Sequence, residues 1–424
     1  MDRRRFLHSL SLAAAAPALG ALAACSSAPP RGAPHVVVVG GGYGGTTAAK
    51  YLRMWSAGRV AVTLVEREPR FVSCPMSNLV LAGLRSMDDL TASYDQLRSR
   101  WGVRVVTDAA TSVDAAKRRV RLANNGEIGF DRVVLSPGVD FLADDIPGLA
   151  GNFERIPHAW KAGPQTELLR RQIAAMPAGG VFALHVPKSP YRCPPGPYER
   201  ACLVAHYLRT HKPRAKLLLL DANGEIQSKK ALFAAAFAGP YKDLIEYRPD
   251  STLLSVDARN LGAELEFDRV RADVLNVIPP MRAGWLVDAL GIPLVNRRWV
   301  EVDWQTMEVR GLPNVHVLGD AVLAAPGMPK SGHITNQQAK LAAAAIIELL
   351  HGRAPDAAPM LLNTCYSFVD DRNAMHVASV HRYDEAERTF LPVAGAGGLS
   401  PSASEAEGRY ADAWAQNIRA DMLA

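Results

Sequence analysis

The chain has 424 residues, of which 48% are hydrophobic and 21% charged, and its formal net charge is +6. A chain of this length is too long for one ordinary hydrophobic core, so two or three domains are expected. Because the modest positive charge comes without a long basic run, no nucleic-acid partner is expected.

The N-terminus has the pattern of an export signal. The charged segment Arg3–Leu7 (RRRFL) precedes an apolar run rich in Ala and Leu over Leu10–Ala24. The arginines followed by Phe-Leu resemble a twin-arginine signal, a route that carries folded proteins and suits a chain that loads a cofactor before export. The run ends in LAAC (Leu22–Cys25), which resembles a bacterial lipoprotein cleavage site.

We therefore expect residues 1–25 to be an export signal cleaved before Cys25, residues 26–33 to be a linker, and the mature protein to be periplasmic with a lipid anchor on Cys25. One alternative is cleavage by the ordinary peptidase after a pair of small residues. The other is a transmembrane helix, which the shortness of the run and Pro17 disfavour.

A dinucleotide-binding unit is predicted from His35 onward. The strand that begins there runs into Gly40, Gly42 and Gly45 in G-x-G-x-x-G spacing, and the next strand ends at Glu66, 21 residues later. Gly40 permits a tight turn, Gly42 lets the backbone approach a pyrophosphate at the helix N-terminus, and Gly45 allows close helix packing. Glu66 would accept a hydrogen bond from a ribose hydroxyl. The alternative is a glycine-rich turn without a ligand.

Two later strands favour FAD over NAD in this unit. The stretch 130–138 (FDRVVLSPG) ends in a small-residue turn, and 311–321 (GLPNVHVLGDA) ends in Gly319 and Asp320. With the first unit they resemble the two-dinucleotide-binding-domain flavoproteins of glutathione reductase type, in which this aspartate bonds the flavin ribitol chain. The alternative for Asp320 is a helix or turn cap.

The segment after Asp320 belongs to the same predicted flavin site. Lys330 and Ser331 precede a helix predicted over 333–350, whose apolar repeat is strong. By the same resemblance, the helix N-terminus points at the flavin pyrimidine, where its positive end would stabilise an anionic reduced flavin.

A second βαβ pattern, between about 156 and 280, lacks the glycine fingerprint. The strands GGVFALHV and KLLLLDANG flank a predicted helix, and only Gly196 remains in the first turn, between Pro195 and Pro197. Proline has no backbone N–H to offer to a phosphate. The NAD site is therefore predicted to be lost, so that electrons must come from a small donor.

The five cysteines are the remaining chemical feature; they are Cys25, Cys74, Cys193, Cys202 and Cys365. Export permits a disulfide, whereas the absence of a C-x-x-C pair disfavours a structural zinc site or a c-type haem in this chain. Cys74 follows the strand that ends in Glu66, where it would either bond covalently to the flavin or be a buried, inert thiol. Cys193 and Cys365 are 172 positions apart, so the sequence leaves open whether they pair, whether Cys193 pairs with Cys202, or whether all are free thiols.

Six motifs resemble the flavoprotein subunit of flavocytochrome c sulfide dehydrogenase, over about residues 34–424: SCPMSN, PHAWKAGPQTELLRRQ, YRCPPGPYERA, NVIPPMRAG, PMPKSG and LNTCYS. The resemblance implies that Cys74 carries FAD through an 8α-S-cysteinyl thioether. It also implies that Cys193 and Cys365 form a redox-active disulfide beside the flavin, with Glu199 nearby as an acid/base. It assigns no role to Cys202, which we expect to be buried in its helix.

The implied activity is periplasmic oxidation of sulfide to sulfur or polysulfide, with electrons passed to a c-type cytochrome subunit that carries the haem. Hydrosulfide would attack the disulfide and leave a persulfide, and the released thiolate would pass two electrons to the flavin. Arg192 and Lys330 would draw the anion in and favour thiolates, and Glu199 would manage protons. The alternative for these three residues is a surface ion pair.

Three other functions are considered. A sulfide:quinone reductase usually has an apolar C-terminal membrane surface, whereas the tail 405–424 is polar with scattered apolar residues. The proline-filled turn argues against an NAD(P)H-dependent disulfide reductase. The pair of cysteines argues against a flavin-bearing lipoprotein that only relays electrons or scaffolds a partner.

The expected fold is α/β, with two Rossmann-like domains and a small α+β C-terminal interface domain. The FAD domain is expected over 34–155 and 281–350, the second domain without NAD over 156–280, and the interface domain over 351–424. Because Cys365 lies in the last of these, that domain must fold back over the flavin to meet Cys193. A disulfide would hold their Cα atoms within about 7 Å.

Overall fold

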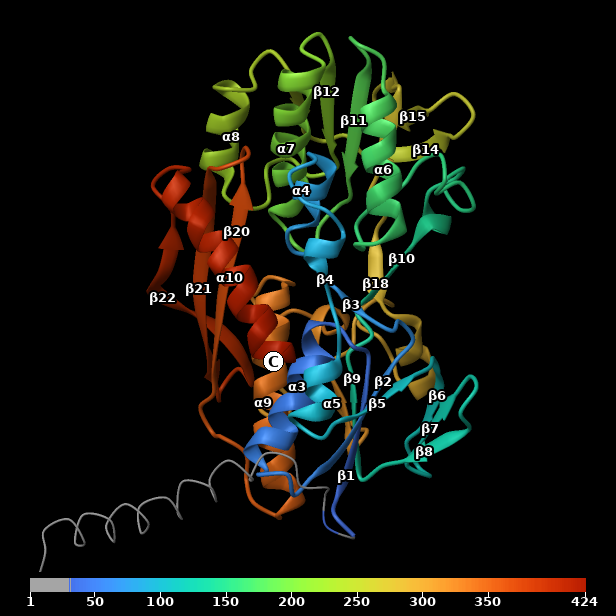
Figure 1. Ribbon diagram of the computed structural model, residues 1–424, viewed down its shortest axis with the longest axis vertical. Helices are drawn as coiled ribbons and strands as arrows, with labels where there is room; N and C mark the ends of the chain where they lie inside the picture. The colour runs from blue at the N-terminus through green and yellow to red at the C-terminus, as the bar shows by residue number, and fades with distance from the viewer. Residues whose placement is uncertain (1–29, 31) are drawn as a thin grey trace, which may run out of the picture.

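The computed structural model describes residue 30 and residues 32–424 (Figure 1). The predicted export signal and Cys25 lie outside the described residues. Within the described part of the chain, no helix is long and apolar enough to cross a membrane. The same residues contain no cluster of His, Cys, Asp and Glu that could hold a metal ion.

The first sheet is parallel and has the strand order β19-β9-β1-β2-β5. Its strands, in that order, are Val315–Val317, Arg132–Leu135, His35–Val39, Ala61–Glu66 and Arg104–Thr107. The valines at 36–38 are fully buried, as expected for a parallel strand covered on both faces. Helix α3 (Tyr43–Trp55) packs on β1 and β2 and lies against α9 (Gly332–Leu350) (Figure 1).

The second sheet is also parallel and has the order β13-β12-β11-β17. Its strands, in that order, are Ile245–Arg248, Lys216–Asp221, Val181–Val186 and Val274–Val277. Its helices are α6 (Pro164–Ala175), α7 (Gly196–His211) and α8 (Lys230–Ala238), which occupy the opposite end of the molecule from α3 and α9 (Figure 1).

An antiparallel pair connects the two sheets. Strand β10 (Val139–Phe141) pairs with β18 (Met281–Ala283). The segment that leaves the first sheet therefore lies beside the segment that returns to it. Because β19 follows β18 and joins the first sheet beside β9, that sheet is built from two separate parts of the chain.

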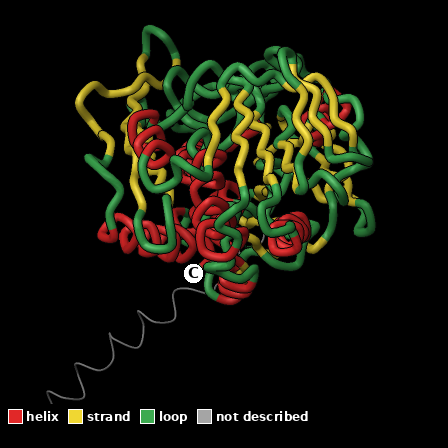
Figure 2. The backbone as a smooth tube through the Cα atoms, turned by 90° about the horizontal axis from the view of Figure 1, so that it is seen from above, coloured by secondary structure: helices red, strands yellow, loops and turns green. Residues whose placement is uncertain are grey.

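The C-terminal region is an antiparallel sheet with one long helix. The sheet contains β20 (Met360–Phe368), β21 (Ala374–Asp384) and β22 (Thr389–Leu399), and α10 (Glu405–Leu423) packs on β21 and α3. Figure 2, seen from above, shows groups of strands with helices packed against them. Two Rossmann-like units followed by an α+β region confirm the predicted α/β fold class.

Smaller elements complete the described chain. Two antiparallel sheets are β6 (Ala110–Asp114), β7 (Arg119–Leu122) and β8 (Glu127–Gly129), and β14 (Leu253–Asp257), β15 (Gly262–Leu265) and β16 (Arg269–Arg271). The others are β3 (Phe71–Val72), β4 (Thr91–Ala92), α4 (Ser77–Leu81), α5 (Asp95–Ser99), η1 (Asp88–Leu90), η2 (Ala143–Asp145), η3 (Trp285–Leu290) and η4 (Gly319–Ala321).

Candidate flavin and thiol site

A cavity of about 960 Å³ lies at the carboxyl ends of the strands of the first sheet. Gly40 follows β1, Glu66 ends β2, Ser136 follows β9 and Asp320 follows β19, and all four line it. The remaining walls come from the loop after β3, the start of α7 and strand β20. Ligands of open α/β sheets bind at this edge.

The three glycines of the fingerprint have separate structural roles. Gly40 has φ +100°, and a Cβ there would lie 2.3 Å from the carbonyl oxygen of Ser136. A Cβ at Gly45 would lie 1.7 Å from the carbonyl oxygen of Gly40, so α3 can pack this closely only without a side chain. No atom lies within 4 Å of a Cβ position at Gly42. The backbone of Gly42 is therefore open to a ligand in the cavity.

The carboxylate of Glu66 lies beside the same turn. Its Oε2 accepts from the backbone N–H of Gly41 at 2.5 Å and its Oε1 from that of Glu68 at 2.9 Å. Glu66 also lines the cavity. These hydrogen bonds fix the carboxylate beside the glycine turn, and the ribose contact stays a prediction.

Asp320 carries an acceptor without a partner. Its Oδ1 is buried and has no hydrogen-bond partner among the described residues, and its Oδ2 lies 3.9 Å from Nη1 of Arg192. A buried carboxylate oxygen without a partner is costly. Asp320 thus offers a free acceptor to a hydroxyl-bearing group in the cavity. Gly319, which precedes it with φ +80°, donates its N–H to Oε1 of Gln338 at 2.8 Å.

Helix α9 presents its N-terminus to the cavity. Ser331 is its N-cap and accepts from the N–H of Ile334 at 3.0 Å, while Gly332 and His333 line the cavity. The residues present fit a flavin nucleotide, since they combine an open glycine backbone, an unpartnered acceptor and the positive end of a helix. Ser331 contributes mainly as this cap, and its Oγ also donates to Oδ1 of Asn363 at 2.7 Å.

Cys74 lies on the cavity wall, in the loop between β3 and α4. Its Sγ accepts from the N–H of Ala162 and from Nη2 of Arg192, each at 3.5 Å. The thiol is therefore held between a backbone donor and a cation on the cavity wall, and its bond to the flavin stays a prediction.

The proline-rich loop fixes Cys193 in an unusual backbone conformation. Cys193 has φ +57°, its N–H donates to the carbonyl of Lys330 at 2.8 Å, and its carbonyl accepts from Gly196 at 2.9 Å. A Cβ at Gly196 would lie 2.7 Å from Cη2 of Trp160 and 2.9 Å from Sγ of Cys193. Glycine is therefore required at 196 by close packing around the thiol.

Cys193 and Cys365 line the same cavity, although they come from α7's loop and from β20. Both are free thiols in the structure, as are Cys74 and Cys202, so their disulfide stays a prediction. Cys193 is accessible from the cavity, but the protein around it still desolvates its thiol and raises its pKa, and the nearby Cys365 and Glu199 raise it further. Burial also raises the pKa of Cys365, whose Sγ donates to Oδ1 of Asn363 at 3.5 Å.

Glu199 lies in the first turn of α7 and also faces the cavity. Its Oε1 accepts from the N–H of Phe368 at 2.9 Å and its Oε2 from Nδ2 of Asn78 at 2.8 Å. Burial raises its pKa above the ordinary value, although these hydrogen bonds oppose the shift. The alternative of a surface ion pair is therefore wrong for Glu199.

Lys330 is buried rather than on the surface. Its Nζ donates to the carbonyl oxygens of Asp320, at 2.9 Å, and of Val322, and lies 3.8 Å from the ring centroid of Trp299. Burial lowers its pKa to about 8. The surface-pair alternative is wrong here too, and the ammonium holds the turn after β19 in place. Lys330 also lines the cavity, so an effect of its charge on an entering anion stays a prediction.

In the second sheet, the acid at the position of a ribose-binding residue is buried and has internal partners. Asp221 ends β12, where a dinucleotide-binding unit carries its ribose-binding acid. Its Oδ2 accepts from the hydroxyls of Tyr198, at 2.7 Å, and Tyr247, at 3.1 Å. Its Oδ1 accepts from the N–H of Asn223 at 3.0 Å. These internal partners support the predicted loss of the NAD site. Cys202, on the same helix as Tyr198, is fully buried as expected.

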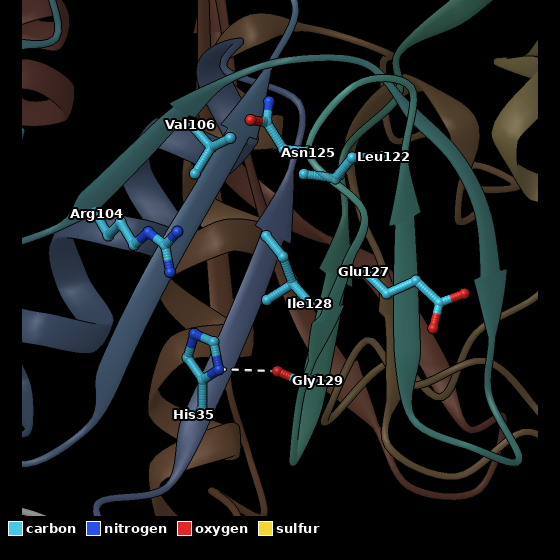
Figure 3. A pocket seen from close by; sticks show the side chains of 8 residues that line it. All are labelled: His35, Arg104, Val106, Leu122, Asn125, Glu127, Ile128 and Gly129. Carbon is cyan, nitrogen blue, oxygen red and sulfur yellow. Dashed lines mark hydrogen bonds between the residues drawn. The ribbon is translucent and has the colours of Figure 1, made fainter.

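A smaller pocket of about 300 Å³ lies at the other end of the first sheet, where β1 begins (Figure 3). It is lined by His35, Arg104, Val106, Leu122, Asn125, Glu127, Ile128 and Gly129. The His35 ring is satisfied, by the carbonyl of Gly129 at 2.8 Å and by Oγ1 of Thr63 at 2.9 Å. The pocket contains no thiol and none of the predicted site residues.

Two buried cations near the thiols were missed by the sequence analysis. Arg200, on the cavity wall, donates to Oδ1 of Asn78 at 3.0 Å and to Oδ1 of Asn276 at 2.9 Å, and burial lowers its pKa to about 9. Lys229 is 4% exposed and reaches the C-terminal sheet. The position of Arg200 beside Glu199 in the first turn of a helix was an available signal, but nothing in the sequence around Lys229 marks it.

Three family models match successive parts of the chain. "Pyridine nucleotide-disulphide oxidoreductase" matches residues 34–173. "Sulfide dehydrogenase [flavocytochrome c] flavoprotein chain, central" matches residues 166–279, which contain Cys193 and most of the second sheet. "Flavocytochrome c sulphide dehydrogenase, flavin-binding" matches residues 357–423, which contain Cys365 and α10.

A curated relative decides the family. The flavoprotein chain of sulfide dehydrogenase (flavocytochrome c) from Chlorobaculum thiosulfatiphilum is 55% identical over 49 residues, which are 12% of this chain and all of that sequence. The chain belongs to this family. The resemblance drawn from the motifs of this flavoprotein is therefore confirmed.

The flavoprotein is also similar to sulfide:quinone oxidoreductases. It is 24% identical to the mitochondrial enzyme of Mus musculus over 309 residues, 68% of this chain and 65% of that one. The chain thus spans just under two thirds of that relative's length. A sulfide:quinone oxidoreductase structure from Aquifex aeolicus has a TM-score of 0.76 at 17% identity over 92% of both chains. The covalent putidaredoxin reductase–putidaredoxin complex has a TM-score of 0.64 at 17% identity, over 91% of this chain and 93% of that one. Both likenesses show the fold.

Proposed function

We propose that this flavoprotein oxidises sulfide to sulfur or polysulfide with a Cys193–Cys365 disulfide and FAD. The observation that carries the proposal is that both thiols line the cavity that also contains the glycine turn, Cys74 and Asp320. The two thiols and a nucleotide site of flavin type therefore share one cavity. Membership of the flavocytochrome c family supports the same substrate.

The protein residues account for the sulfur chemistry. Hydrosulfide attacks one sulfur of the disulfide, the S–S bond breaks, and a persulfide and a thiolate result. A second hydrosulfide attacks the outer persulfide sulfur and carries it away, which frees the second thiolate. The two thiolates return to the disulfide as two electrons leave them. Glu199, whose pKa burial raises, is positioned to give or take protons in these exchanges.

FAD, when bound, supplies the two-electron acceptor for the thiolates and the one-electron donor for the next carrier. Gly42 and the α3 N-terminus would hold its pyrophosphate, Glu66 its ribose and Asp320 its ribitol chain. Cys74 would hold its ring through the thioether that the family resemblance implies. Family membership supports a c-type cytochrome as the carrier, with the haem on that partner chain.

Sulfide turnover with different acceptors tests the proposal. Purified, flavin-loaded protein is given sulfide without oxygen, together with cytochrome c, a soluble quinone or NAD⁺. We expect cytochrome reduction by the wild type and by Cys202→Ala, whose buried thiol lies outside the cavity lining. We expect losses of at least about 100-fold for Cys193→Ala and Cys365→Ala, since the nucleophilic step is removed. Reduction of quinone alone would replace the cytochrome as acceptor, and full activity of either cysteine variant would overturn the disulfide mechanism.

The proposed location is the periplasm, after twin-arginine export and lipidation at Cys25. Intact mass under denaturing conditions checks the covalent features in the same preparation. A retained FAD mass that is lost in Cys74→Ala supports the thioether. A diacylglyceryl mass on a chain that begins at Cys25 supports the anchor.

A further inference from the structure

Lys229 places a buried positive charge against the C-terminal sheet, near the thiol of Cys365. It is the N-cap of α8, in the left-handed region with φ +53°, and only 4% of the residue is exposed. Its Nζ donates to Oγ of Ser367 at 2.8 Å and to the carbonyl oxygen of Met375 at 3.2 Å. Ser367 and Met375 are paired across β20 and β21, so the ammonium lies against these two strands.

This position is close to Cys365. Ser367 follows Cys365 by two residues on β20, so their side chains lie on the same face, about 7 Å apart along the strand. The next residue, Phe368, donates its N–H to Glu199 at 2.9 Å. Cys365, Glu199 and Lys229 therefore meet around one short stretch of β20.

The ammonium has only neutral hydrogen-bond partners. Both of its acceptors, a hydroxyl and a carbonyl, are uncharged, and it forms no ion pair with any described residue. Buried charges are usually paired, because an unpaired one is costly. The groups that act on it electrostatically are Cys365, Glu199, Cys193 and Glu407, in that order. Glu407 is already engaged, by His376 and Ser400.

We propose that Lys229 is a positioning residue whose buried ammonium stabilises Cys365 as a thiolate, which makes Cys365 the leaving sulfur of the disulfide. The proposal rests on the proposed function. Hydrosulfide bonds to Sγ of Cys193, the more exposed of the two thiols, and the S–S bond breaks. The electron pair leaves on Sγ of Cys365, so one anion is consumed and one is formed. The new negative charge appears beside an ammonium that had no anionic partner.

Electrostatic effects on the thiol itself agree with this role. Burial raises the pKa of Cys365, and Lys229 is the largest influence that lowers it, with Asn363 and Ser331 also lowering it and Glu199 raising it. Burial lowers the pKa of Lys229 to about 8, against the raising effect of the thiols and Glu199. The ammonium is thus present at neutral pH and is lost above about pH 8.

Alkylation of Cys365 tests the proposal without sulfide or an electron acceptor. The reduced, flavin-loaded full chain with Cys193→Ala is treated with iodoacetamide from pH 6 to 10, and modification of the Cys365 peptide is followed by mass spectrometry. A unit charge near a thiol in partly buried surroundings changes its ionisation constant by about ten- to hundred-fold. We expect Lys229→Met to slow alkylation at pH 7.5 by at least about ten-fold and to move the profile to higher pH.

Matched variants separate charge from structure. Lys229→Arg keeps the charge and should stay within about three-fold of the parent rate. Lys229→Gln keeps a donor for Ser367 and should be slowed as much as Lys229→Met. Lys230→Met removes the neighbouring exposed lysine, which pairs with Glu225 at 2.5 Å, and should change nothing.

An unchanged alkylation profile in folded Lys229→Met and Lys229→Gln would overturn the role of Lys229, whatever their thermal stability. If Lys229→Met fails to fold, the comparison of Lys229→Gln with Lys229→Arg decides the question. Failure of the proposed function is recognised in a different measurement. In that case the wild type, in which Lys229 is present, would reduce no acceptor when it is given sulfide.

Discussion

Glu199 brings an ionisable carboxyl into the wall of the cavity that Cys193 and Cys365 also line. Both of its oxygens are held, by Phe368 from the C-terminal sheet and by Asn78 from α4. Burial raises its pKa although these donors oppose the change. The carboxyl therefore keeps its proton to a higher pH than an exposed glutamate, which suits a group that donates to a departing thiolate.

Replacement of Glu199 by Gln should lower sulfide turnover by about 100-fold, the usual contribution of a positioned acid or base. It should also change the pH dependence of stability. Because the folded pKa lies above the ordinary value of 4.5, the unfolded chain loses this proton first, and the wild type loses stability as the pH rises from 4.5 toward the folded pKa. The glutamine variant lacks this loss.

Urea unfolding of both proteins between pH 4 and pH 8 measures the effect. The variant should gain stability relative to the wild type as the pH rises. The control is Glu266→Gln, at an exposed position. Its free energy of unfolding should change with pH as that of the wild type does. Parallel curves for Glu199→Gln as well would contradict a raised pKa at this position.

The residues that could be predicted are those whose role follows from local spacing. Gly40 and Gly45 occupy the tight turn and the close helix contact that the fingerprint predicts, the pyrophosphate contact of Gly42 stays a prediction, and Asp320 is placed by the strand and turn before it. Lys229 could not be found in this way, because its partners lie 138 and 146 positions away in the C-terminal sheet. Its burial depends on how α8 meets β20 and β21, which no local pattern encodes.

At the scale of elements, the loop from Pro190 to Gly196 lies where a dinucleotide-binding unit would have its phosphate-binding turn, and it holds Cys193 through backbone hydrogen bonds. The prolines predicted the loss of phosphate donors. In the structure, the N–H of Cys193 donates to the backbone carbonyl of Lys330. The hydroxyl of Tyr198 donates to Asp221, the acid at the end of β12. These contacts join residues that are far apart in the sequence, so they could not be predicted from it, and the loss of the NAD site stays a prediction that they support.

Gly196→Ala should displace the thiol of Cys193 or the ring of Trp160, since the new Cβ would lie 2.9 Å and 2.7 Å from them. Overpacking of this kind costs about 1–3 kcal/mol. We expect sulfide turnover to fall by at least about ten-fold and Cys193 to form its disulfide with Cys365 more slowly, as followed by thiol titration during reoxidation.

Gly262→Ala is the matched control. Gly262 lies in β15, far along the chain from the cysteines, and a Cβ there would make only an ordinary contact of 3.6 Å. It should leave turnover and reoxidation unchanged. Equal behaviour of the two variants would show that close packing at Gly196 does not position Cys193.

At the scale of the whole molecule, the C-terminal region closes the cavity over the first sheet. It supplies Cys365 from β20 and Trp414 from α10 to the lining. We expected this region to fold back, because Cys365 had to meet Cys193. The contacts that hold α10 in place could not be predicted, because they reach α3 and α9, more than 300 and about 85 positions away.

Asp421 anchors the end of α10. Its carboxylate accepts from the hydroxyl of Tyr51 at 2.5 Å and from Nδ2 of Asn336 at 2.8 Å, and pairs with Nζ of Lys340 at 3.0 Å. Burial opposes its charge, but these three donors together hold its pKa below the ordinary value of 3.8. The stability it contributes is therefore present above about pH 3.8 and is lost as the pH falls through the folded pKa.

Asp421→Asn should lower the free energy of unfolding at pH 7 by about 1–3 kcal/mol, because it weakens a partly buried, charge-assisted network. The control is Asp412→Asn on the same helix, whose pair with Arg85 is more exposed and should be worth at most about 1 kcal/mol. Because α10 carries Trp414 into the cavity wall, Asp421→Asn should also increase the access of iodoacetamide to Cys365, measured by the same peptide assay. A destabilised Asp421→Asn variant with unchanged alkylation would show that α10 stabilises the fold without closing the site.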